Sequence, residues 1–112
     1  METEGKYSTE IQKKQEKIIT FYGVHKQLSQ LVEECAELIV AIQKQQRYDF
    51  STVSDTIFDG VIEEMADVKN LIEQLELYRH YVARGVKITI ENKTDRELER
   101  IKADRKKWIR GV

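Results

Sequence analysis

The chain has 112 residues, of which 40% are apolar and 35% charged, with a formal net charge of −1. These proportions predict one globular domain over residues 1–112 with a modest core, and they exclude an intrinsically disordered chain. Proline is absent and glycine occurs five times, which favours a few long helices over an all-β fold. No apolar run approaches the roughly 20 residues of a membrane span. The first residues do not resemble a signal peptide and the lone cysteine cannot form an internal disulfide, so we expect a cytoplasmic protein that does not enter a membrane.

The charges are unevenly distributed along this nearly neutral chain. Residues 1–30 carry five bases and four acids, residues 31–77 carry three bases and eleven acids, and residues 78–112 carry eleven bases and five acids. The three segments therefore have charges of +1, −8 and +6, which sum to −1. Exposed helix faces that attract each other would account for this pattern, so charge alone does not establish a site.

Two helices are expected in the first half of the chain. The first begins at Ser8 or Thr9, where a capping-box pattern occurs, and ends at about Tyr22, before Gly23. The second runs from about His25 to Gln46. Its apolar residues recur at helical spacing and are expected to form one stripe facing the core: Leu28, Leu31, Val32, Cys35, Leu38, Ile39 and Ile42.

Two more helices are expected in the second half. A loop over Arg47–Asp55 precedes a third helix, which begins at Asp55 or Thr56 and ends at about Ala83, before Arg84-Gly85. The last helix ends near Trp108 and begins at Thr89 or Thr94, of which we favour the earlier start. A short extended arm would equally fit the alternating residues Val86, Ile88 and Ile90. The chain is therefore predicted to be all-α, with four to five helices and a central antiparallel hairpin.

Each of the two central helices carries two carboxylates spaced three residues apart. Glu34 and Glu37 in the second helix share one helix face, and so do Glu64 and Asp67 in the third, with about 5–6 Å between neighbours. Packing these helices together would gather four carboxylates, which repel one another unless a hard divalent cation lies among them. Mg²⁺ and Mn²⁺ are the natural candidates for such oxygen ligands. Acids on helix faces are usually just solvated, so the spacing alone leaves the interpretation open.

Glu64 occupies an unusual position for a surface acid. Residues of the third helix at alternating spacings of four and three form a heptad-like seam, which this one carboxylate interrupts: Ile57, Val61, Glu64, Val68, Leu71, Leu75, Tyr78 and Val82. Burying an unpaired carboxylate costs several kcal/mol. This position therefore favours a metal ligand over a solvated side chain.

The doubled motif resembles a known family. Glu33-Glu34-Cys35-Ala36-Glu37-Leu38 and Glu63-Glu64-Met65-Ala66-Asp67-Val68 are similar to the motifs of the all-α nucleoside triphosphate pyrophosphohydrolases, with 26 residues (38–63) between Glu37 and Glu64. These are the MazG-like proteins, dimeric dUTPases and phosphoribosyl-ATP pyrophosphatases. The resemblance covers about residues 18–101, including Tyr22-Gly23, Gln27-Leu28 and a closing Lys93-x-x-Arg96-x-x-x-Arg100, which looks like the last helix of small phage-type MazG-like proteins.

The resemblance implies a Mg²⁺-dependent hydrolase that cleaves a nucleoside triphosphate or deoxynucleoside triphosphate between its α and β phosphates. The products would be a nucleoside monophosphate and pyrophosphate, as in an enzyme that cleans the nucleotide pool. Transferred residue by residue, the metal ligands would be Glu34, Glu37, Glu64 and Asp67. Such ions neutralise phosphate oxygens and lower the pKa of a bound water. Glu33 or Glu37 would then orient or deprotonate that water.

Substrate contacts are expected from the basic last segment and from polar residues near the acidic motifs. Lys93, Arg96 and Arg100 follow a three-then-four spacing, so they share one helix face and could hold a polyphosphate. A solvated surface face is the alternative for them. The other candidates lie three or seven residues from a motif carboxylate: Gln27, Lys44 and Asn70. An ordinary surface position is the alternative for each of them, and for Lys44 it is the favoured one.

Three alternatives compete with this interpretation. Ala83-Arg84-Gly85-Val86 is like the pattern of phosphoribosyl-ATP pyrophosphatases, but Gln30-Leu31-Val32 stands where that subgroup has Lys-Val-Gly. A non-catalytic helical interaction module would explain the seam but not Glu64 within it. Nucleic-acid binding is disfavoured because acids are mixed into the basic segment and the rest of the chain would repel a phosphate backbone.

The predicted hairpin is too small to cover its own seam on both sides. We therefore expect a homodimer or homotetramer whose interface completes a helical bundle. The family resemblance implies the same, and it further implies that residues of a second copy contribute to each site.

Overall fold

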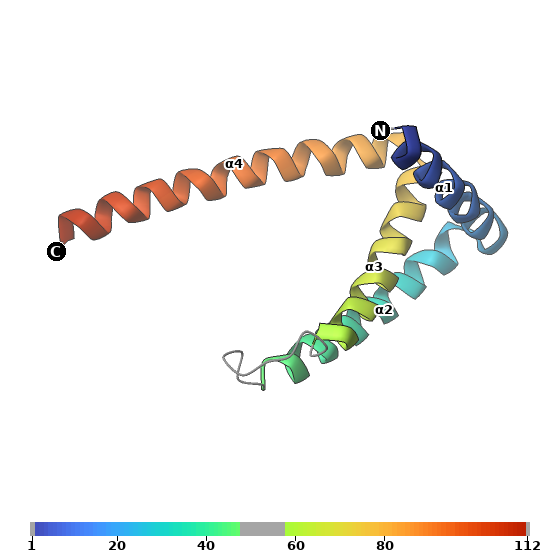
Figure 1. The fold of residues 1–112 in the computed structure, drawn as a ribbon, viewed down its shortest axis with the longest axis horizontal. Coiled ribbons are helices and arrows are strands. Elements are labelled where there is room, and N and C mark those ends of the chain that lie inside the picture. The colour runs from blue at the N-terminus through green and yellow to red at the C-terminus, as the bar shows by residue number, and fades with distance from the viewer. Residues whose placement is uncertain (1, 48–57, 112) are drawn as a thin grey trace. The chain divides into compact units, whose positions relative to one another are not determined.

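The structure, a computed structural model, describes residues 2–47 and 58–111, and the side chains of residues 9–47 and 58–106. These residues form four helices and no strand: α1 (Glu2–Tyr22), α2 (Val24–Gln45), α3 (Asp59–Tyr78) and α4 (His80–Gly111), shown in Figure 1. The prediction of an all-α chain is confirmed. The predicted loop after Arg47, the predicted start of the third helix and Ile57 lie within 48–57, outside the described residues.

The chain divides into two units, Met1–Arg79 and His80–Val112, each of which is described by itself. The first contains α1, α2 and α3, all of which pack against one another, and the second contains α4 alone. No helix among the described residues is long and apolar enough to cross a membrane.

Gly23 separates α1 from α2, as predicted. Its φ of +86° lies in the left-handed region, which glycine adopts without a Cβ penalty. The Gly23 N–H donates to the Ile19 carbonyl at 2.8 Å, which closes the last turn of α1. The predicted start of this helix at Ser8 or Thr9 is wrong, because α1 already begins at Glu2. Acidic residues at the N-terminal end favour that extension through the helix dipole.

α2 and α3 run in opposite directions. Gln27, near the start of α2, donates to Gln74, near the end of α3, at 2.8 Å. At the other end of the pair, Gln45 and Val61 line the same pocket. The buried and half-buried positions of α2 are spaced four and three apart: Gln27, Leu31, Glu34, Leu38, Ala41 and Gln45. They face a matching series in α3, which confirms this part of its predicted seam: Val61, Glu64, Val68, Leu71 and Leu75. The predicted seam is wrong at Tyr78, which is exposed, and at Val82, which belongs to α4.

The interior of the first unit is small and strongly polar. Among the described residues, the buried apolar side chains are Ile19, Val61 and Leu71, whereas four glutamines are buried: Gln15, Gln27, Gln45 and Gln74. Three of these glutamines join the helices through hydrogen bonds, because Gln27 donates to Gln74, and both Gln74 and Gln15 donate to Asn70 Oδ1. Gln15 also donates to Glu73 at 3.0 Å. This amide network fixes α1 against the α2–α3 pair.

Much of the predicted apolar stripe of α2 does not face the core. Val32 is 71% exposed, Ile39 is 57% exposed, and Cys35 is an exposed thiol, so its predicted burial is wrong. The exposed residues each follow a seam residue of α2 by one position: Leu28, Val32, Cys35, Ile39 and Ile42. α3 has a similar exposed series: Phe58, Ile62, Met65 and Ile72.

Helix geometry places these two series on one side of the pair. A step of one residue rotates a side chain by about 100° around its helix. Because the helices are antiparallel, this step turns both series to the same side. We call these nine residues the apolar face. The acids that precede a seam residue by one position, Glu33, Glu37, Glu63 and Asp67, turn to the opposite side.

The break between the last two helices falls at Arg79 rather than at Gly85. Arg79 is extended, with φ −140° and ψ 111°, and its guanidinium stacks 4.5 Å from the centre of the Tyr78 ring. The predicted continuation of the third helix to Ala83 and the predicted last-helix start at Thr89 or Thr94 are therefore wrong. A single glycine costs a helix only about 1 kcal/mol relative to alanine, so α4 passes through Gly85 without interruption.

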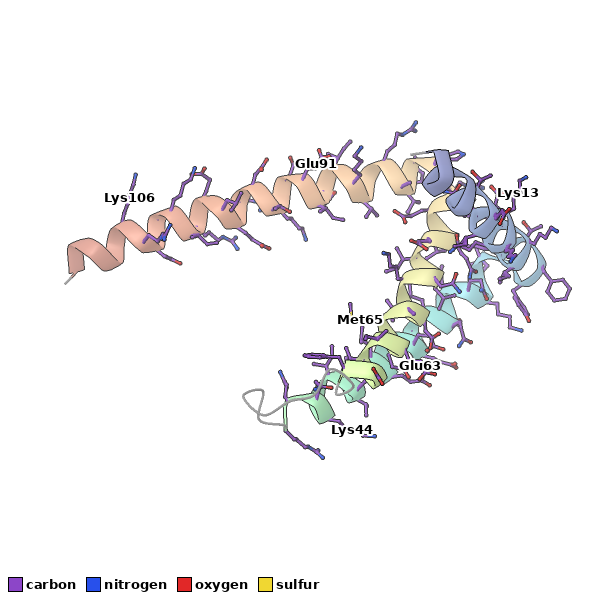
Figure 2. All side chains as sticks on the ribbon, in the orientation of Figure 1. Lys13, Lys44, Glu63, Met65, Glu91 and Lys106 are labelled. Atoms are coloured by element: carbon purple, nitrogen blue, oxygen red, sulfur yellow. The ribbon has the colours of Figure 1, made fainter. Side chains whose placement is uncertain are left out.

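α4 is a single helix whose described side chains from Lys87 to Lys106 are all exposed. Figure 2 shows them projecting on different sides of the helix, among them Glu91 and Lys106. The extended arm considered for Val86, Ile88 and Ile90 is wrong, because all three lie within α4. The Thr94 hydroxyl donates to the Ile90 carbonyl at 2.6 Å, so this residue is interior to the helix instead of capping it.

Candidate functional site

Three of the four predicted metal ligands converge between α2 and α3. Glu34, Glu37 and Glu64 each offer one carboxylate oxygen, and these oxygens all lie within 4.8 Å of one another. Glu34 and Glu64 occupy facing seam positions and are half-buried, whereas Glu37 is exposed. The geometry follows from the sequence, because the spacing of three within α2 places two carboxylates on one face and the antiparallel packing brings the third opposite them.

Two oxygens of this cluster lie in an environment that suits a cation. Glu34 Oε2 and Glu64 Oε2 are buried and have no hydrogen-bond partner, although Gln30 Nε2 donates to Glu34 Oε1 at 2.9 Å. In the part of the chain that the structure describes, the sole ion pair joins Lys102 and Glu99 on α4, so no basic side chain neutralises the cluster. Buried carboxylate oxygens without donors are unfavourable, and a hard divalent cation would satisfy them. The donor set therefore fits Mg²⁺ or Mn²⁺.

The remaining predicted acids are placed differently. Asp67 is exposed and is not part of the group of three. Glu33 is also exposed and lies on the same side of the pair as Glu37. The prediction that Asp67 is a metal ligand, and that Glu33 or Glu37 acts on a water, remains a prediction.

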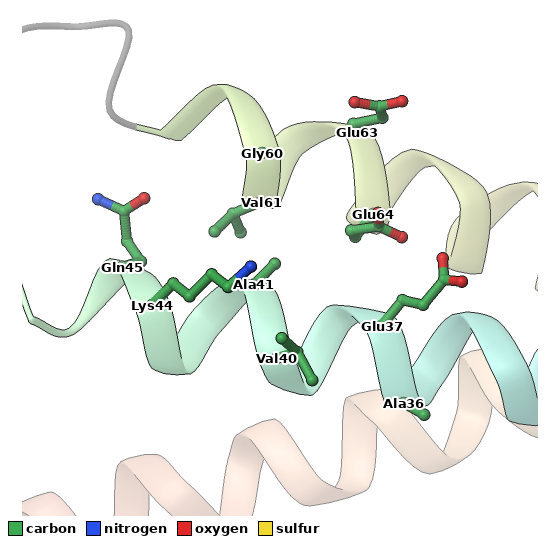
Figure 3. A pocket seen from close by; sticks show the side chains of 10 residues that line it. All are labelled: Ala36, Glu37, Val40, Ala41, Lys44, Gln45, Gly60, Val61, Glu63 and Glu64. Carbon is green, nitrogen blue, oxygen red and sulfur yellow. The ribbon is translucent and has the colours of Figure 1, made fainter.

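A pocket of about 570 Å³ lies next to the carboxylates. Figure 3 shows Glu37 and Glu64 at one end of this pocket and Gln45 at the other, with the Lys44 side chain extending from the Gln45 end toward Ala41. Apolar side chains from both helices lie between the two ends: Val40, Ala41 and Val61. Lys44, one of the predicted substrate residues, is thus a lining residue, and the pocket has both a charged end and an apolar middle.

Two other predicted substrate residues belong to the amide network of the interior. Gln27 is 5% exposed and its Nε2 donates to Gln74 Oε1. Asn70 is exposed, but its Oδ1 accepts from Gln74 and from Gln15. Both side chains therefore have a structural role in holding the three helices together, and their contact with a substrate remains a prediction.

The predicted basic group lies together on α4. Lys93, Arg96 and Arg100 line a shallow pocket of about 290 Å³ with Glu97. This arrangement agrees with the predicted shared helix face. All four side chains are exposed, and three cations against one acid could hold an anion.

Two pocket residues were not recognised from the sequence. Gln45 is 7% exposed and its Nε2 has no hydrogen-bond partner. Glu63 also lines the pocket, although an acid on a helix face is usually just solvated. A signal for Gln45 exists in retrospect, since it continues the four-and-three spacing of Gln27, Leu31, Glu34, Leu38 and Ala41.

Comparison of the chain with models of protein families, with curated proteins and with solved structures finds no match.

Proposed function

We propose that this chain hydrolyses a nucleoside triphosphate or deoxynucleoside triphosphate between its α and β phosphates, with Mg²⁺ as cofactor and with Mn²⁺ as a substitute. The observation that carries the proposal is the set of three carboxylates from two helices, within 4.8 Å of one another, beside a pocket of about 570 Å³. The resemblance of the doubled acidic motif to the MazG-like pyrophosphohydrolases supports the same reaction. A role in cleaning the cytoplasmic nucleotide pool follows from that reaction.

The two ends of the pocket suit the two ends of a nucleotide. Bound Mg²⁺ would supply neutralisation of the phosphate oxygens and acidify the attacking water. Glu34, Glu37 and Glu64 would hold it, with Asp67 as the fourth ligand inferred from the resemblance. In the reaction, water adds to the α-phosphorus, the bond to the bridging oxygen breaks and pyrophosphate leaves.

Specific side chains of this chain would complete the reaction. Glu33 or Glu37, both exposed carboxylates, would accept the proton of the attacking water. The cations on α4, Lys93, Arg96 and Arg100, would hold the departing polyphosphate, from the same chain or from a second copy.

The chain is further proposed to act as a homodimer or homotetramer. The apolar face of the α2–α3 pair leaves nine apolar side chains exposed, among them Val32 at 71% and Ile62 at 58%. Soluble monomers rarely expose large contiguous apolar patches, and three buried apolar side chains make a small core for the described part of the chain. A second copy that packs its own apolar face against this one would complete a four-helix bundle around the two hairpins. Glu37 would stay accessible, because it turns to the opposite side, and Glu34 and Glu64 lie in the seam between the two helices.

A second candidate is a non-catalytic helical module that binds a partner through the same apolar face. The exposed apolar side chains favour it as much as they favour a dimer. Unpartnered Glu34 and Glu64 oxygens oppose it, because a purely structural helix pair gains nothing from three carboxylates at this distance.

Pyrophosphate release from a panel of canonical and modified nucleoside triphosphates tests the proposal. The reaction is run with Mg²⁺, with Mn²⁺ and with EDTA, and monophosphate is measured in parallel to identify the bond that breaks. Metal-dependent formation of equal amounts of monophosphate and pyrophosphate is expected. Release of orthophosphate would contradict cleavage at the α–β bond. Metal binding without turnover of any triphosphate in the panel would make phosphoribosyl-ATP the next substrate to test. Absence of both metal binding and turnover would favour the non-catalytic helical module.

A further inference from the structure

Lys44 extends its side chain along the pocket toward the carboxylates. Its backbone lies at the Gln45 end, and Figure 3 shows the side chain pointing from there toward Ala41, which lies between this end and Glu37 on the same helix. In the part of the chain that the structure describes, Lys44 is the one basic residue that lines this pocket. Lysines on helix faces are mostly solvated, and its place in the pocket is the feature that distinguishes Lys44.

The Lys44 ammonium forms no ion pair with the neighbouring acids. Three carboxylates line the same pocket, yet the sole ion pair among the described residues lies on α4. Lys44 follows Glu37, the nearest acid of its own helix, by seven residues, which is about 10 Å along the helix axis. The ammonium has three hydrogen-bond donors and no acceptor. These donors therefore remain available to an anionic ligand in the pocket.

A triphosphate bound at the carboxylates would bring such an anion to Lys44. The metal ion would lie at the α-phosphate, where the bond breaks, and the other phosphate groups would extend away from it. The departing pyrophosphate takes up negative charge during the reaction. A lysine ammonium is a compact point charge that suits phosphate oxygens. Lys44 and the carboxylates belong to the same unit of the structure, so this contact needs no residue of α4.

We propose that Lys44 binds the phosphate groups beyond the α-phosphate, and that it makes the pocket prefer a nucleoside triphosphate to the corresponding monophosphate. The inference rests on the proposed function, because the carboxylates must hold the metal ion and the α-phosphate. During the reaction the ammonium keeps its protons and offsets the charge that develops on pyrophosphate. Lys44 thus acts as a substrate-binding residue on the same helix as two of the proposed metal ligands, Glu34 and Glu37.

Binding of a triphosphate that cannot be hydrolysed tests this contact without turnover. An analogue with a methylene group between the α- and β-phosphorus atoms is titrated calorimetrically in the presence of Mg²⁺, and the nucleoside monophosphate is titrated in parallel. Lys44→Gln removes the charge and should weaken binding of the analogue about tenfold, as expected for loss of one hydrogen bond to a charged group. Binding of the monophosphate should change by less than about twofold, because it lacks the phosphate groups that Lys44 contacts. Lys44→Arg keeps the charge and should restore most of the affinity for the analogue.

A matched variant and two further measurements keep the test interpretable. Lys13→Gln makes the same change at an exposed lysine of α1 outside the pocket, and should leave both affinities unchanged; Figure 2 labels both lysines. Lys44→Gln should keep the rise in Tm that Mg²⁺ causes, because Lys44 is not one of the grouped carboxylates. In turnover assays, Lys44→Gln should lower kcat/KM for pyrophosphate release about tenfold and weaken inhibition by inorganic pyrophosphate by a similar factor.

The outcomes separate this inference from the proposed function. Analogue binding that Lys44→Gln leaves unchanged, or an equal loss for the analogue and the monophosphate, overturns the inference while the hydrolase stands. Loss of the Mg²⁺ shift in Lys44→Gln also overturns it, because the variant would then act through the metal site. If the wild type releases no pyrophosphate, the proposed function fails and the titrations still decide: a loss confined to the analogue supports the Lys44 contact, and absence of binding overturns both.

Discussion

The substitution Glu64→Gln tests whether the three carboxylates form a metal site. It removes one charge from the cluster and keeps the size of the side chain. The protein without divalent cations is expected to become more stable, whereas stabilisation by Mg²⁺ is expected to disappear together with catalysis. Loss of a side chain that binds a ligand normally lowers the free energy of unfolding of the ligand-free protein or leaves it unchanged. A rise in this free energy without divalent cations, together with loss of the stabilisation by Mg²⁺, therefore identifies charge repulsion that a cation relieves.

The magnitude follows from the geometry of the cluster. Two unit charges at the observed limit of 4.8 Å repel by about 0.9 kcal/mol in bulk water and by about 3.5 kcal/mol at an effective dielectric constant of 20. Glu64 takes part in two such pairs, but Glu37 is exposed, so solvent screens one of them. We therefore expect the free energy of unfolding in EDTA to rise by about 1–2 kcal/mol. This rise corresponds to an upward shift in Tm of roughly 5–10 °C.

Thermal melts of both proteins, with EDTA and with MgCl₂ at matched ionic strength, measure the two effects. Mg²⁺ at about 100 times its Kd should stabilise the wild type by about 2.7 kcal/mol and the variant by much less. Glu16→Gln is the control, because Glu16 is an exposed carboxylate on α1 outside the cluster; its effect should stay within about 0.5 kcal/mol. A variant that melts below the wild type in EDTA, or that keeps the full Mg²⁺ shift, would refute the reasoning.

Three further predictions concern other parts of the chain. Val32→Glu places a charge in the apolar face and should convert the proposed oligomer to a monomer, as measured by light scattering; an oligomer whose mass is unchanged would exclude this face from the interface. Gln74→Leu leaves the Gln27 amide without its acceptor and should lower the free energy of unfolding by about 1–3 kcal/mol in urea titrations, whereas Gln43→Leu at an exposed site should change it little. Arg96→Gln should raise KM for a triphosphate without altering the Mg²⁺ shift in Tm, and an unchanged KM would remove α4 from the site.

The seam of α3 was predictable from the sequence because its pattern is simple. Val61, Leu71 and their neighbours repeat every three or four residues, and the structure buries or half-buries them. Glu64 interrupts this pattern at one position, so a single sequence was enough to identify it as an exception. The convergence of Glu34 and Glu37 with Glu64 could also be predicted, since it needs only helical spacing and an adjacent helix.

The orientation of α2 was not predictable in the same way. Its most apolar series, which includes Val32 and Ile39, faces away from α3, and a more polar series with Gln27 and Gln45 faces inward. Hydrophobic periodicity finds the most apolar face of a helix but does not say which neighbour covers it. The buried Gln27 becomes favourable only because it meets the Gln74 amide of α3. That meeting depends on tertiary structure, and no local pattern indicates it.

The ends of the helices could be predicted from glycine in one case and not in another. Gly23 ends α1 because its positive φ turns the chain. The presence of a glycine at this position was enough to predict that end. Gly85 carries the same residue type but lies inside α4, whereas Arg79, a residue without any breaking tendency, separates α3 from α4. Glycine therefore marks a break only where the chain must turn.

The two exposed sides of the α2–α3 pair explain why the sequence combines features that normally conflict. The seam residues Glu34 and Glu64 would be costly in a helix pair that served only as a core, and residues such as Val32 would be costly on a helix pair that stayed exposed to water. Both costs are offset if a cation binds on one side and a second copy covers the other. Because one rigid pair of helices carries both features, docking of the second copy would also fix the spacing of the carboxylates. Under this arrangement, Val32→Glu should weaken Mg²⁺ binding as well as association, although Val32 turns away from the acids.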